Sequence, residues 1–279
     1  MFVSQVIAAL ALLGVCFVLF GVLGRLFPCN RDQPVFFSKS IGLDLGYCLL
    51  GVLYAEAGPA VAGALSVTPL AGVAASAPGQ WLLHAPLLAQ LAILLGVTDF
   101  AQYWLHRGFH GRRLWPYHAT HHSAVEVNWT TTFRTHPVNY LAVTSSLAIL
   151  ARLAGFSETA LLLAGPIFFF SGVFTHANLN WTFGPLKFAL ASPVFHRWHH
   201  SLDAEHRERN FAPMFPVWDL MFGTFHMPRG RLPAVFGAEG VPADLIGQLI
   251  YPVRPGRSGL GTGAVQPAVH REAGVGEGV

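Results

Sequence analysis

Long apolar segments are the feature of this sequence that most restricts its fold. The first covers residues 2–24, where Ser4 and Gln5 are the only clearly polar residues. A helix needs about 20 predominantly apolar residues to cross a bilayer. We therefore predict an all-α, polytopic membrane helical bundle. The further apolar segments cover about 41–67, 81–105, 138–156 and 159–173.

The composition agrees with a membrane protein. Charged residues make up 11% of the chain, whereas soluble globular proteins carry roughly 25%. A cleaved signal peptide would need Lys or Arg before its apolar core. The first basic residue is Arg25, which follows that core, so we expect a retained helix. The pI of about 8.9 fits contact with anionic lipid headgroups and does not call for nucleic acid.

The distribution of basic residues predicts an orientation. Arg25, Arg31 and Lys39 lie between the first two apolar segments, whereas residues 66–80 carry no charge. Most other Lys and Arg residues follow the third segment. Cytoplasmic loops are enriched in these residues, so we expect the N-terminus outside and the second half facing the cytoplasm. The last two apolar segments could form either a spanning or a re-entrant hairpin.

The same pattern predicts a division of the chain. Residues 1–80 would form N-terminal transmembrane helices, and residues 81–252 would form a catalytic domain. Residues 253–279 are rich in Gly, Pro and Ala without apolar periodicity. We expect this last part to be a disordered tail.

Eight of the fourteen histidines lie in two short windows of the sequence. Their spacing is i, i+3 and i+4 or i, i+4, which places them on shared helical faces. Imidazole suits iron, zinc, copper and nickel, and eight rings are too many for one tetrahedral ion, so we predict two metals. These candidate ligands are His106, His110, His118, His121, His122, His196, His199 and His200.

Helix-start signals precede both triple-histidine boxes. Pro116 lies two residues before His118, and Ser192-Pro193 lies three residues before His196. Serine is favoured at the N-cap and proline in the first turn of a helix. We therefore expect each box to lie in the first turns of a helix.

Other polar residues lie close to these boxes. Asp99 is placed to accept the second ring N–H of His106 or His110, as carboxylates near metal sites do; the alternative is an ordinary helix-end charge at the membrane interface. His176 ends the fifth apolar segment, and we expect it to be a further ligand. Asn180 would share its face if the helix continues, as a ligand or a supporting partner.

Three other histidines have less definite roles. His136 and His206 are open as ligands, although His206 is more readily explained as a supporting or surface residue. His84 begins the third apolar segment, so we expect it on the far side of the membrane, away from the boxes.

The residues from Asp99 to His226 resemble the fatty acid hydroxylase / sterol desaturase superfamily of membrane di-iron oxygenases. The resemblance rests on the histidine spacing and on the words DFAQYWLHRGFH, FRTHPVN, FTHANLN and NFAPMFPVWDLMFGTFH. It implies a cytosol-facing pair of irons that activates O2 and hydroxylates or desaturates a lipid-like substrate such as a sterol or fatty acyl chain. The eight box histidines and His176 match the family's histidines. Asn210 and Trp218-Asp219 match its closing motif, for which we expect a structural role.

Electrons would come from a separate protein of ferredoxin or cytochrome b5 type, because no haem-binding segment is recognised in this sequence. Two other functions use the same histidines. A membrane zinc hydrolase would be expected to place a carboxylate beside them, as in H-E-x-x-H, and neither triple box has one. A metal transporter would place ionisable residues along the spans. The sequence leaves open hydroxylation versus desaturation, the lipid and the oligomeric state.

Overall fold

The computed structural model describes residues 2–54, 60–61, 63–64, 76–203, 206 and 208–254. Nearly all of the tail expected at 253–279 lies outside these residues. Within the described part of the chain, the regular structure is helical. The only β pairing there is an isolated antiparallel bridge between Ser201 and Phe236. The predicted all-α class is confirmed.

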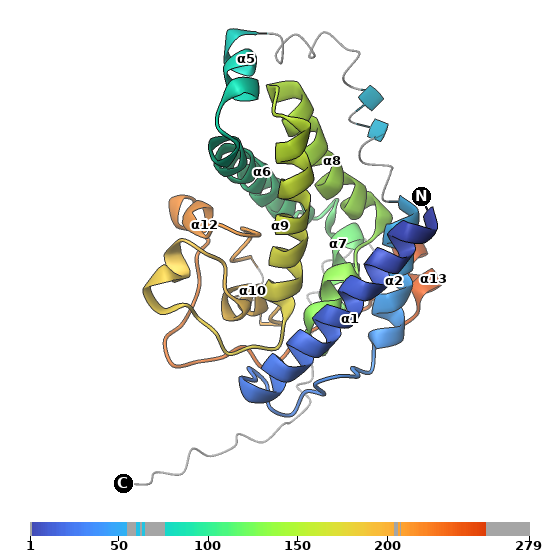
Figure 1. Cartoon of the computed structure of the whole chain (residues 1–279). Coiled ribbons are helices and arrows are strands. Elements are labelled where there is room, and N and C mark those ends of the chain that lie inside the picture. Colours follow the sequence, from blue (N-terminus) through green and yellow to red (C-terminus); the bar gives the residue numbers. More distant parts are fainter. Residues whose placement is uncertain are drawn as a thin grey trace.

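Among the residues that the structure describes fully, three helices are long and apolar enough to cross a membrane: α6 (Leu87–Phe109), α8 (Pro137–Ala154) and α9 (Glu158–His176). In Figure 1, α8 and α9 lie side by side and are antiparallel. Gly155 joins them in a left-handed conformation (φ 84°) that glycine adopts without strain. The sequence expectation of a membrane helical bundle is confirmed by these helices.

The third apolar segment is not one continuous helix as expected. It divides into α5 (Ala77–His84) and α6, and α5 also includes the last residues of the uncharged segment 66–80. Ala85 is extended (φ −66°, ψ 153°) directly before Pro86. Proline disfavours the helical conformation of the residue before it, which explains the break.

The N-terminal helices α1 (Phe2–Leu26) and α2 (Ile41–Tyr54) flank this bundle (Figure 1). Helix α2 has 14 residues, or about 21 Å at 1.5 Å per residue, which is less than a hydrocarbon core. Most of the remaining part of its expected segment lies outside the described residues. Cys16 and Phe20 of α1 pack in one core cluster with Trp129 and Val173.

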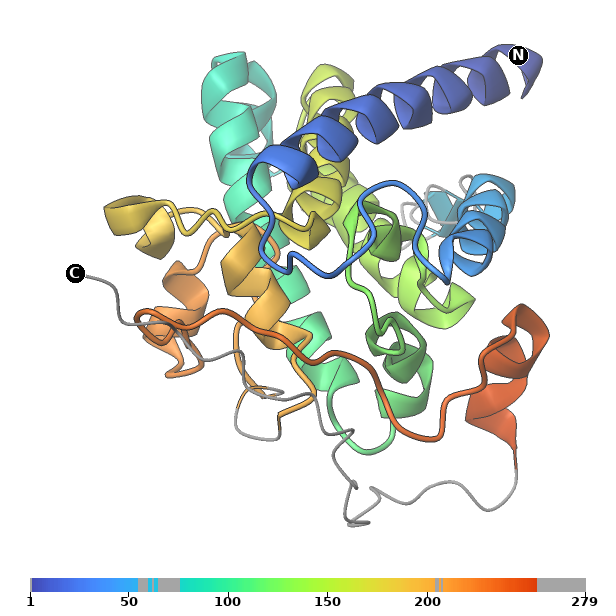
Figure 2. The same ribbon diagram turned by 90° about the horizontal axis from the view of Figure 1, so that it is seen from below.

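Short elements gather where α6 and α9 end. Figure 2 views the molecule from this side, with the histidine-bearing helices between α1 and the last described residues. The tight contact of α6 with α8 and α9 depends on small side chains, since Ala151, Ala160 and Ala164 pack against Leu94. The short elements are α7 (Trp115–His122), η2 (Trp129–Phe133), η3 (Gly184–Phe188), α10 (Pro193–His199), α12 (Val217–Met221), α13 (Leu245–Ile250) and η4 (Tyr251–Val253).

Candidate metal centre

Nine histidines converge in two adjoining groups at this end of the bundle. Within each group, one ring nitrogen per residue lies within 4.8 Å of those of the other members. These are the same nine histidines that the sequence singled out. The five-histidine group is His106, His110, His118, His122 and His199, and the four-histidine group is His121, His176, His196 and His200.

The helix starts that bring the boxes together are those expected. Helix α10 begins at Pro193, and the Ser192 hydroxyl accepts a hydrogen bond from the Phe195 N–H at 3.2 Å. Helix α7 carries Pro116 in its first turn. The long helices supply the remaining rings, because His176 is the last residue of α9 and His106 lies in the last turn of α6.

Each triple box is divided between the groups. From α7, His118 and His122 join the five-histidine group, whereas His121 joins the four-histidine group. From α10, His196 and His200 join the four-histidine group, and His199 crosses to the other. Successive helical residues point about 100° apart. An i, i+4 pair therefore faces one metal position while the i+3 ring between them reaches the second.

Backbone carbonyls fix the protons on several of these rings. A carbonyl oxygen only accepts hydrogen bonds, so a ring nitrogen bonded to it carries the proton, and the other nitrogen of a neutral ring then has a bare lone pair. The bonds from Nδ1 to carbonyl oxygens are His106 to Phe211 (2.7 Å), His121 to Arg134 (3.1 Å), His176 to Gly172 (2.6 Å) and His199 to Arg209 (2.7 Å).

The lone pairs left by this arrangement point at one another. The Nε2 atoms of His121 and His176 lie 3.1 Å apart, and neither can donate a proton to the other. In the five-histidine group, the Nε2 atoms of His106 and His118 lie 3.0 Å apart. Two imidazole lone pairs at this separation repel unless a cation lies between or beside them. The donor set and its tautomers therefore fit a metal ion in each group.

Burial favours the neutral rings that metal binding needs. Desolvation lowers the pKa of His121 and His199 well below the ordinary histidine value, and neighbouring imidazoles lower it further. Burial is also the largest cause that lowers the pKa values of His118, His122, His196 and His200. A neutral imidazole is the form that ligates metals.

Asn139 is a supporting residue that sequence reasoning missed. Its Oδ1 accepts a hydrogen bond from Nδ1 of His118 at 2.8 Å. It occurs in the word FRTHPVN, which carried part of the family resemblance, so the signal was present. The neighbouring His136 caps α8 instead, because its Nδ1 accepts from the Val138 N–H while Nε2 meets the Leu249 carbonyl. Both of its nitrogens are engaged away from the two groups.

The expected hydrogen bond between Asp99 and His106 or His110 is not found. The Asp99 carboxylate accepts from the backbone N–H groups of Met214 (2.8 Å) and Phe215 (3.0 Å) and from the Trp218 indole (2.9 Å). The partner of His106 is the Phe211 carbonyl instead. Asp99 therefore acts one step farther from the metal centre, by holding the segment that carries this carbonyl.

Asp219 and Asn210 hold the same segment from its other side. Asp219 accepts from the N–H groups of Phe211 (2.8 Å) and Ala212 (2.9 Å). Asn210 has a left-handed backbone (φ 57°), and its amide group bonds the Phe195 carbonyl at 2.8 Å. These hydrogen bonds support the structural role that the closing motif implied.

The premise behind the Asn180 prediction is wrong. Helix α9 ends at His176, so Asn180 does not continue its face. Asn180 is exposed, and its backbone N–H donates to the Phe27 carbonyl at 2.9 Å. The buried amide in this segment is Asn178, which exchanges two hydrogen bonds with the Asn30 backbone.

A buried ion pair connects α2 to the four-histidine group. The Arg134 guanidinium donates to the Asp44 carboxylate at 2.7 Å and 2.5 Å, and the side chains are 2% and 0% exposed. Thr130 also donates to Asp44, at 2.6 Å. Because the Arg134 carbonyl accepts from His121, this ion pair fixes the backbone that orients a candidate ligand. Asp44 is the only acidic residue of the apolar helix α2, a signal that could have identified it.

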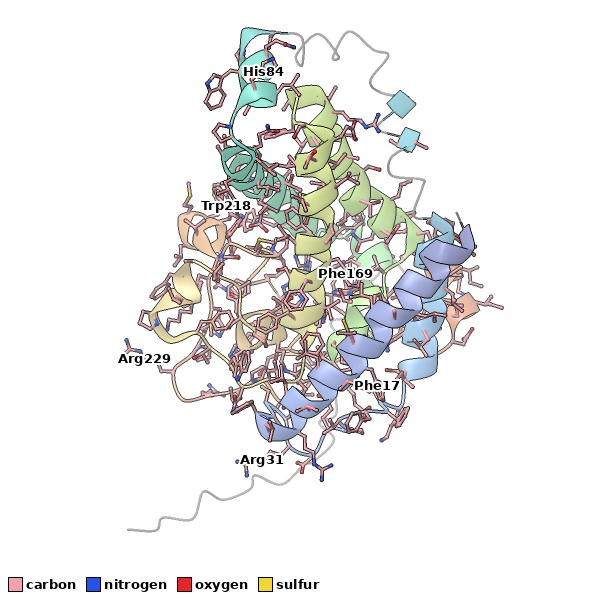
Figure 3. The ribbon with its side chains drawn as sticks, viewed as in Figure 1. Phe17, Arg31, His84, Phe169, Trp218 and Arg229 are labelled. Carbon is pink, nitrogen blue, oxygen red and sulfur yellow. The ribbon has the colours of Figure 1, made fainter. Side chains whose placement is uncertain are left out.

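Two other histidines lie outside both groups. His84 is exposed at the end of α5, at the opposite end of the molecule from the metal centre (Figure 3). His206 is buried, with its ring centroid 4.5 Å from that of Trp198 and 4.6 Å from that of His226. His206 is thus part of a separate aromatic cluster.

A cavity of about 880 Å³ opens beside the metal centre. Its walls are mainly apolar residues of α1, α2, α8 and α9, including Phe169, which Figure 3 labels on α9. Arg152, from the last turn of α8, also lines it. The histidines that reach it come from both groups: His106, His118, His121, His176 and His196.

Comparison with known proteins places this centre in a family. Residues 91–224 match the fatty acid hydroxylase family. The chain is 32% identical over 183 residues to the ornithine lipid hydroxylase OlsE of Rhizobium tropici, covering 64% of this chain and 54% of that protein. It is 33% identical over 142 residues to human alkylglycerol monooxygenase, covering 47% and 29%.

A third relative is the very-long-chain aldehyde decarbonylase GL1-6 of rice (Oryza sativa subsp. indica), 28% identical over 157 residues and covering 52% of this chain and 24% of that protein. The chain thus spans about half or less of the length of these relatives. No solved structure matches it. All nine converging histidines lie inside the matched region, and these similarities support the fatty acid hydroxylase / sterol desaturase superfamily as the family of this chain.

Proposed function

We propose that each histidine group holds one iron ion and that the protein uses O2 to hydroxylate a membrane lipid. The observation that carries this proposal is the convergence of nine imidazoles in two adjoining groups, with the protons of four of them held on the opposite ring nitrogen by carbonyl oxygens. The adjoining apolar cavity supports a lipid as the substrate.

Iron is favoured over zinc by the chemistry required. Bound iron would supply the redox chemistry that O2 activation needs and that zinc lacks. Within the described part of the chain, both groups consist of histidine alone. A zinc hydrolase would be expected to place its general-base carboxylate within the histidine box, as in H-E-x-x-H, whereas Glu208, whose carboxylate lies 3.6 Å from Nδ1 of His110, is outside the boxes and 63% exposed. That alternative therefore has less support than the oxygenase.

The metal transporter alternative also has less support. A transporter would place ionisable groups along the spans to form a path. In the described helices, Asp99 of α6 is committed to three hydrogen bonds with the segment 214–218. Arg152 lies in the last turn of α8. The candidate ligands gather at one end of the bundle, as a catalytic centre requires.

The protein's own residues would orient the ligands and the substrate. Asn139 and the carbonyls of Phe211 and Gly172 hold ring protons away from the metal positions. The apolar walls of α8 and α9 would exclude water from the reacting carbon and align an extended chain with the histidines. The substrate's polar head would remain outside this apolar part of the cavity.

The relatives favour hydroxylation over desaturation, because two of them are named as a hydroxylase and a monooxygenase. We propose a substrate with a long acyl or alkyl chain. We also propose that the histidines face the cytoplasm and that electrons come from a separate ferredoxin-like or cytochrome b5-like protein. The orientation follows from the positive-inside rule. The electron carrier follows from the family resemblance.

Isotopically labelled O2 tests the proposed reaction. Iron-loaded protein in bilayer nanodiscs containing lipid extract from its source cells would be given dithionite and a redox mediator. Lipid mass spectrometry should detect one labelled oxygen atom in a lipid product. Protein loaded with zinc is the matched control and should yield none. Iron-loaded protein that neither consumes O2 nor labels any lipid would contradict the oxygenase function.

A further inference from the structure

An exposed, positively charged turn lies directly over the five-histidine group. Residues 111–114 join α6 to α7 and are all exposed. The turn is tight, because the N–H groups of Leu114 and Trp115 both donate to the Gly111 carbonyl at 2.9 Å. It presents Arg112 and Arg113, for which the described residues provide no ion-pair partner. In Figure 2 this short green turn lies on the side of the molecule opposite α1.

Trp115 connects this turn to the candidate ligands. Its side chain is partly exposed. The indole centroid lies 5.2 Å from the ring of His110 and 5.3 Å from that of His122. Both histidines belong to the five-histidine group. One aromatic side chain therefore bridges the protein surface and two candidate metal ligands.

We propose that Arg112 and Arg113 form the docking surface for an acidic one-electron carrier protein, and that Trp115 lies on the path by which its electrons enter. This inference rests on the proposed function, since hydroxylation requires two external electrons. The reaction takes O2, two protons and two electrons. It places one oxygen atom in the C–H bond of the lipid and releases the other as water.

Each electron comes from one carrier molecule, which is oxidised by one electron as the metal centre is reduced by one. Two successive dockings therefore supply one turnover. Electron tunnelling falls steeply with distance, so a carrier should dock where the path to a ligand ring is short. The surface around Trp115 meets this requirement for the five-histidine group, because the indole ring lies beside the rings of His110 and His122.

The charges around the turn favour an acidic partner. Arg107, in the last turn of α6, is turned back along that helix, with its guanidinium carbon 5.4 Å from the Trp104 ring centroid and a hydrogen bond to the Tyr103 hydroxyl, so the charges that the turn presents are those of Arg112 and Arg113. Among the described residues, the acidic group found beside His110 is Glu208, whose carboxylate lies 3.6 Å from Nδ1 of His110 and whose side chain is 63% exposed. Complementary charge speeds encounter and selects partners. The arginines therefore exceed the nearby acidic charge.

Arg229 and Arg231 provide a matched control. They are also two exposed arginines in a turn, separated by Gly230. Figure 3 shows Arg229 projecting from the left edge of the molecule. Reversing these charges changes the net charge of the protein by the same amount as reversing Arg112 and Arg113. A comparison of the two pairs separates docking at one surface from attraction by overall charge.

The experiment measures carrier binding to full-length, iron-loaded protein in nanodiscs at low ionic strength. The probes are a purified acidic ferredoxin and soluble cytochrome b5. The double variant Arg112→Glu/Arg113→Glu should raise the Kd of the carrier that binds by at least about tenfold, and added salt should reduce the difference. Arg229→Glu/Arg231→Glu should change the Kd by less than about twofold. Metal content, measured on each sample, checks that the centre is intact.

A second measurement addresses the path. The rate of metal-centre reduction by pre-reduced carrier, divided by the rate with dithionite, should fall in Trp115→Leu and be largely retained in Trp115→Phe. Equal ratios in these two variants would overturn the role of Trp115.

Several results would overturn the docking proposal. These are failure of both carriers to bind the wild-type protein, an equal or larger effect of the control pair, or an unchanged Kd in the Arg112/Arg113 variant. Failure of the oxygenase function itself looks different, because labelled lipid would then be absent with dithionite as well.

Discussion

The two histidine groups share one ligand chemistry but differ in their surroundings. The four-histidine group is buried throughout, and the carbonyls of Arg134, directly after η2, and of Gly172 in α9 hold the ring protons of His121 and His176. The five-histidine group depends on Asn139 and on the loop that contains Arg209 and Phe211. It also touches Trp115, which reaches the surface. The four-histidine group therefore faces the bundle and the apolar cavity, whereas the five-histidine group also reaches the protein surface through Trp115.

The supports of the two groups are also separate in the sequence. Asp44, in the N-terminal third, holds Arg134 and so reaches the four-histidine group. Asp99 and Asp219 hold the loop that reaches the five-histidine group. Substitutions in these supports should therefore affect one group before the other, and this expectation can be tested.

The largest effect should follow loss of a ligand from either group. His121→Ala removes a ring from the four-histidine group, and His199→Ala removes one from the five-histidine group. If both metals are needed, each variant should lose more than the roughly 10–100-fold in activity expected for outer-shell partners. Labelled-oxygen incorporation is the measurement. Retention of substantial activity by one variant would mean that its group is not needed.

Loss of the Asp44 carboxylate should destabilise the fold around the four-histidine group. Asp44→Asn leaves the buried Arg134 charge without its partner, which typically costs about 3–5 kcal/mol in the free energy of unfolding. Thermal unfolding of the iron-loaded protein in detergent would measure it. Asp32→Asn is the control, because Asp32 is exposed. Equal stability of the two variants would show that the ion pair contributes little.

A smaller and more selective effect is expected at Asn139. Asn139→Ala removes the acceptor that fixes the proton of His118, and such partners change metal affinity by about 10–100-fold. Asn139→Asp keeps an acceptor oxygen and should restore most of that affinity. Metal titration of the metal-free protein would distinguish them. If both variants bound metal equally weakly, the role of Asn139 would be in packing and not in orienting His118.

No effect on metal content is expected for His84→Ala. His84 lies before the start of α6. His106 lies 19 positions after Leu87, the first residue of α6, which corresponds to about 29 Å along the helix. Metal analysis after purification is the measurement. Loss of metal in this variant as complete as in His199→Ala would require a different placement of α5 relative to the centre.

The ligand set could be predicted from the sequence because helical periodicity is local. The i, i+3, i+4 spacing and the Ser-Pro and Pro starts identified the boxes and their helices. The division of each box between two groups could not be predicted in the same way. It depends on how α7 and α10 face each other, which long-range packing decides.

The supporting residues were harder to predict for the same reason. His106 uses the Phe211 carbonyl, 105 positions away in the chain, and not the neighbouring Asp99. A carbonyl acceptor has no sequence signature, since every residue has one. Asn180 was misassigned because the end of α9 at His176 was not evident from the apolar pattern. The break at Pro86, by contrast, was readable from the proline.

The ratio of metal to protein tests the two-group account most directly. Elemental analysis of protein reconstituted with iron should give about two ions per chain for the wild type. His121→Ala and His199→Ala should each retain about one ion, and the double variant should retain little. A single ion in the wild-type protein would contradict the account, as would complete metal retention in both single variants.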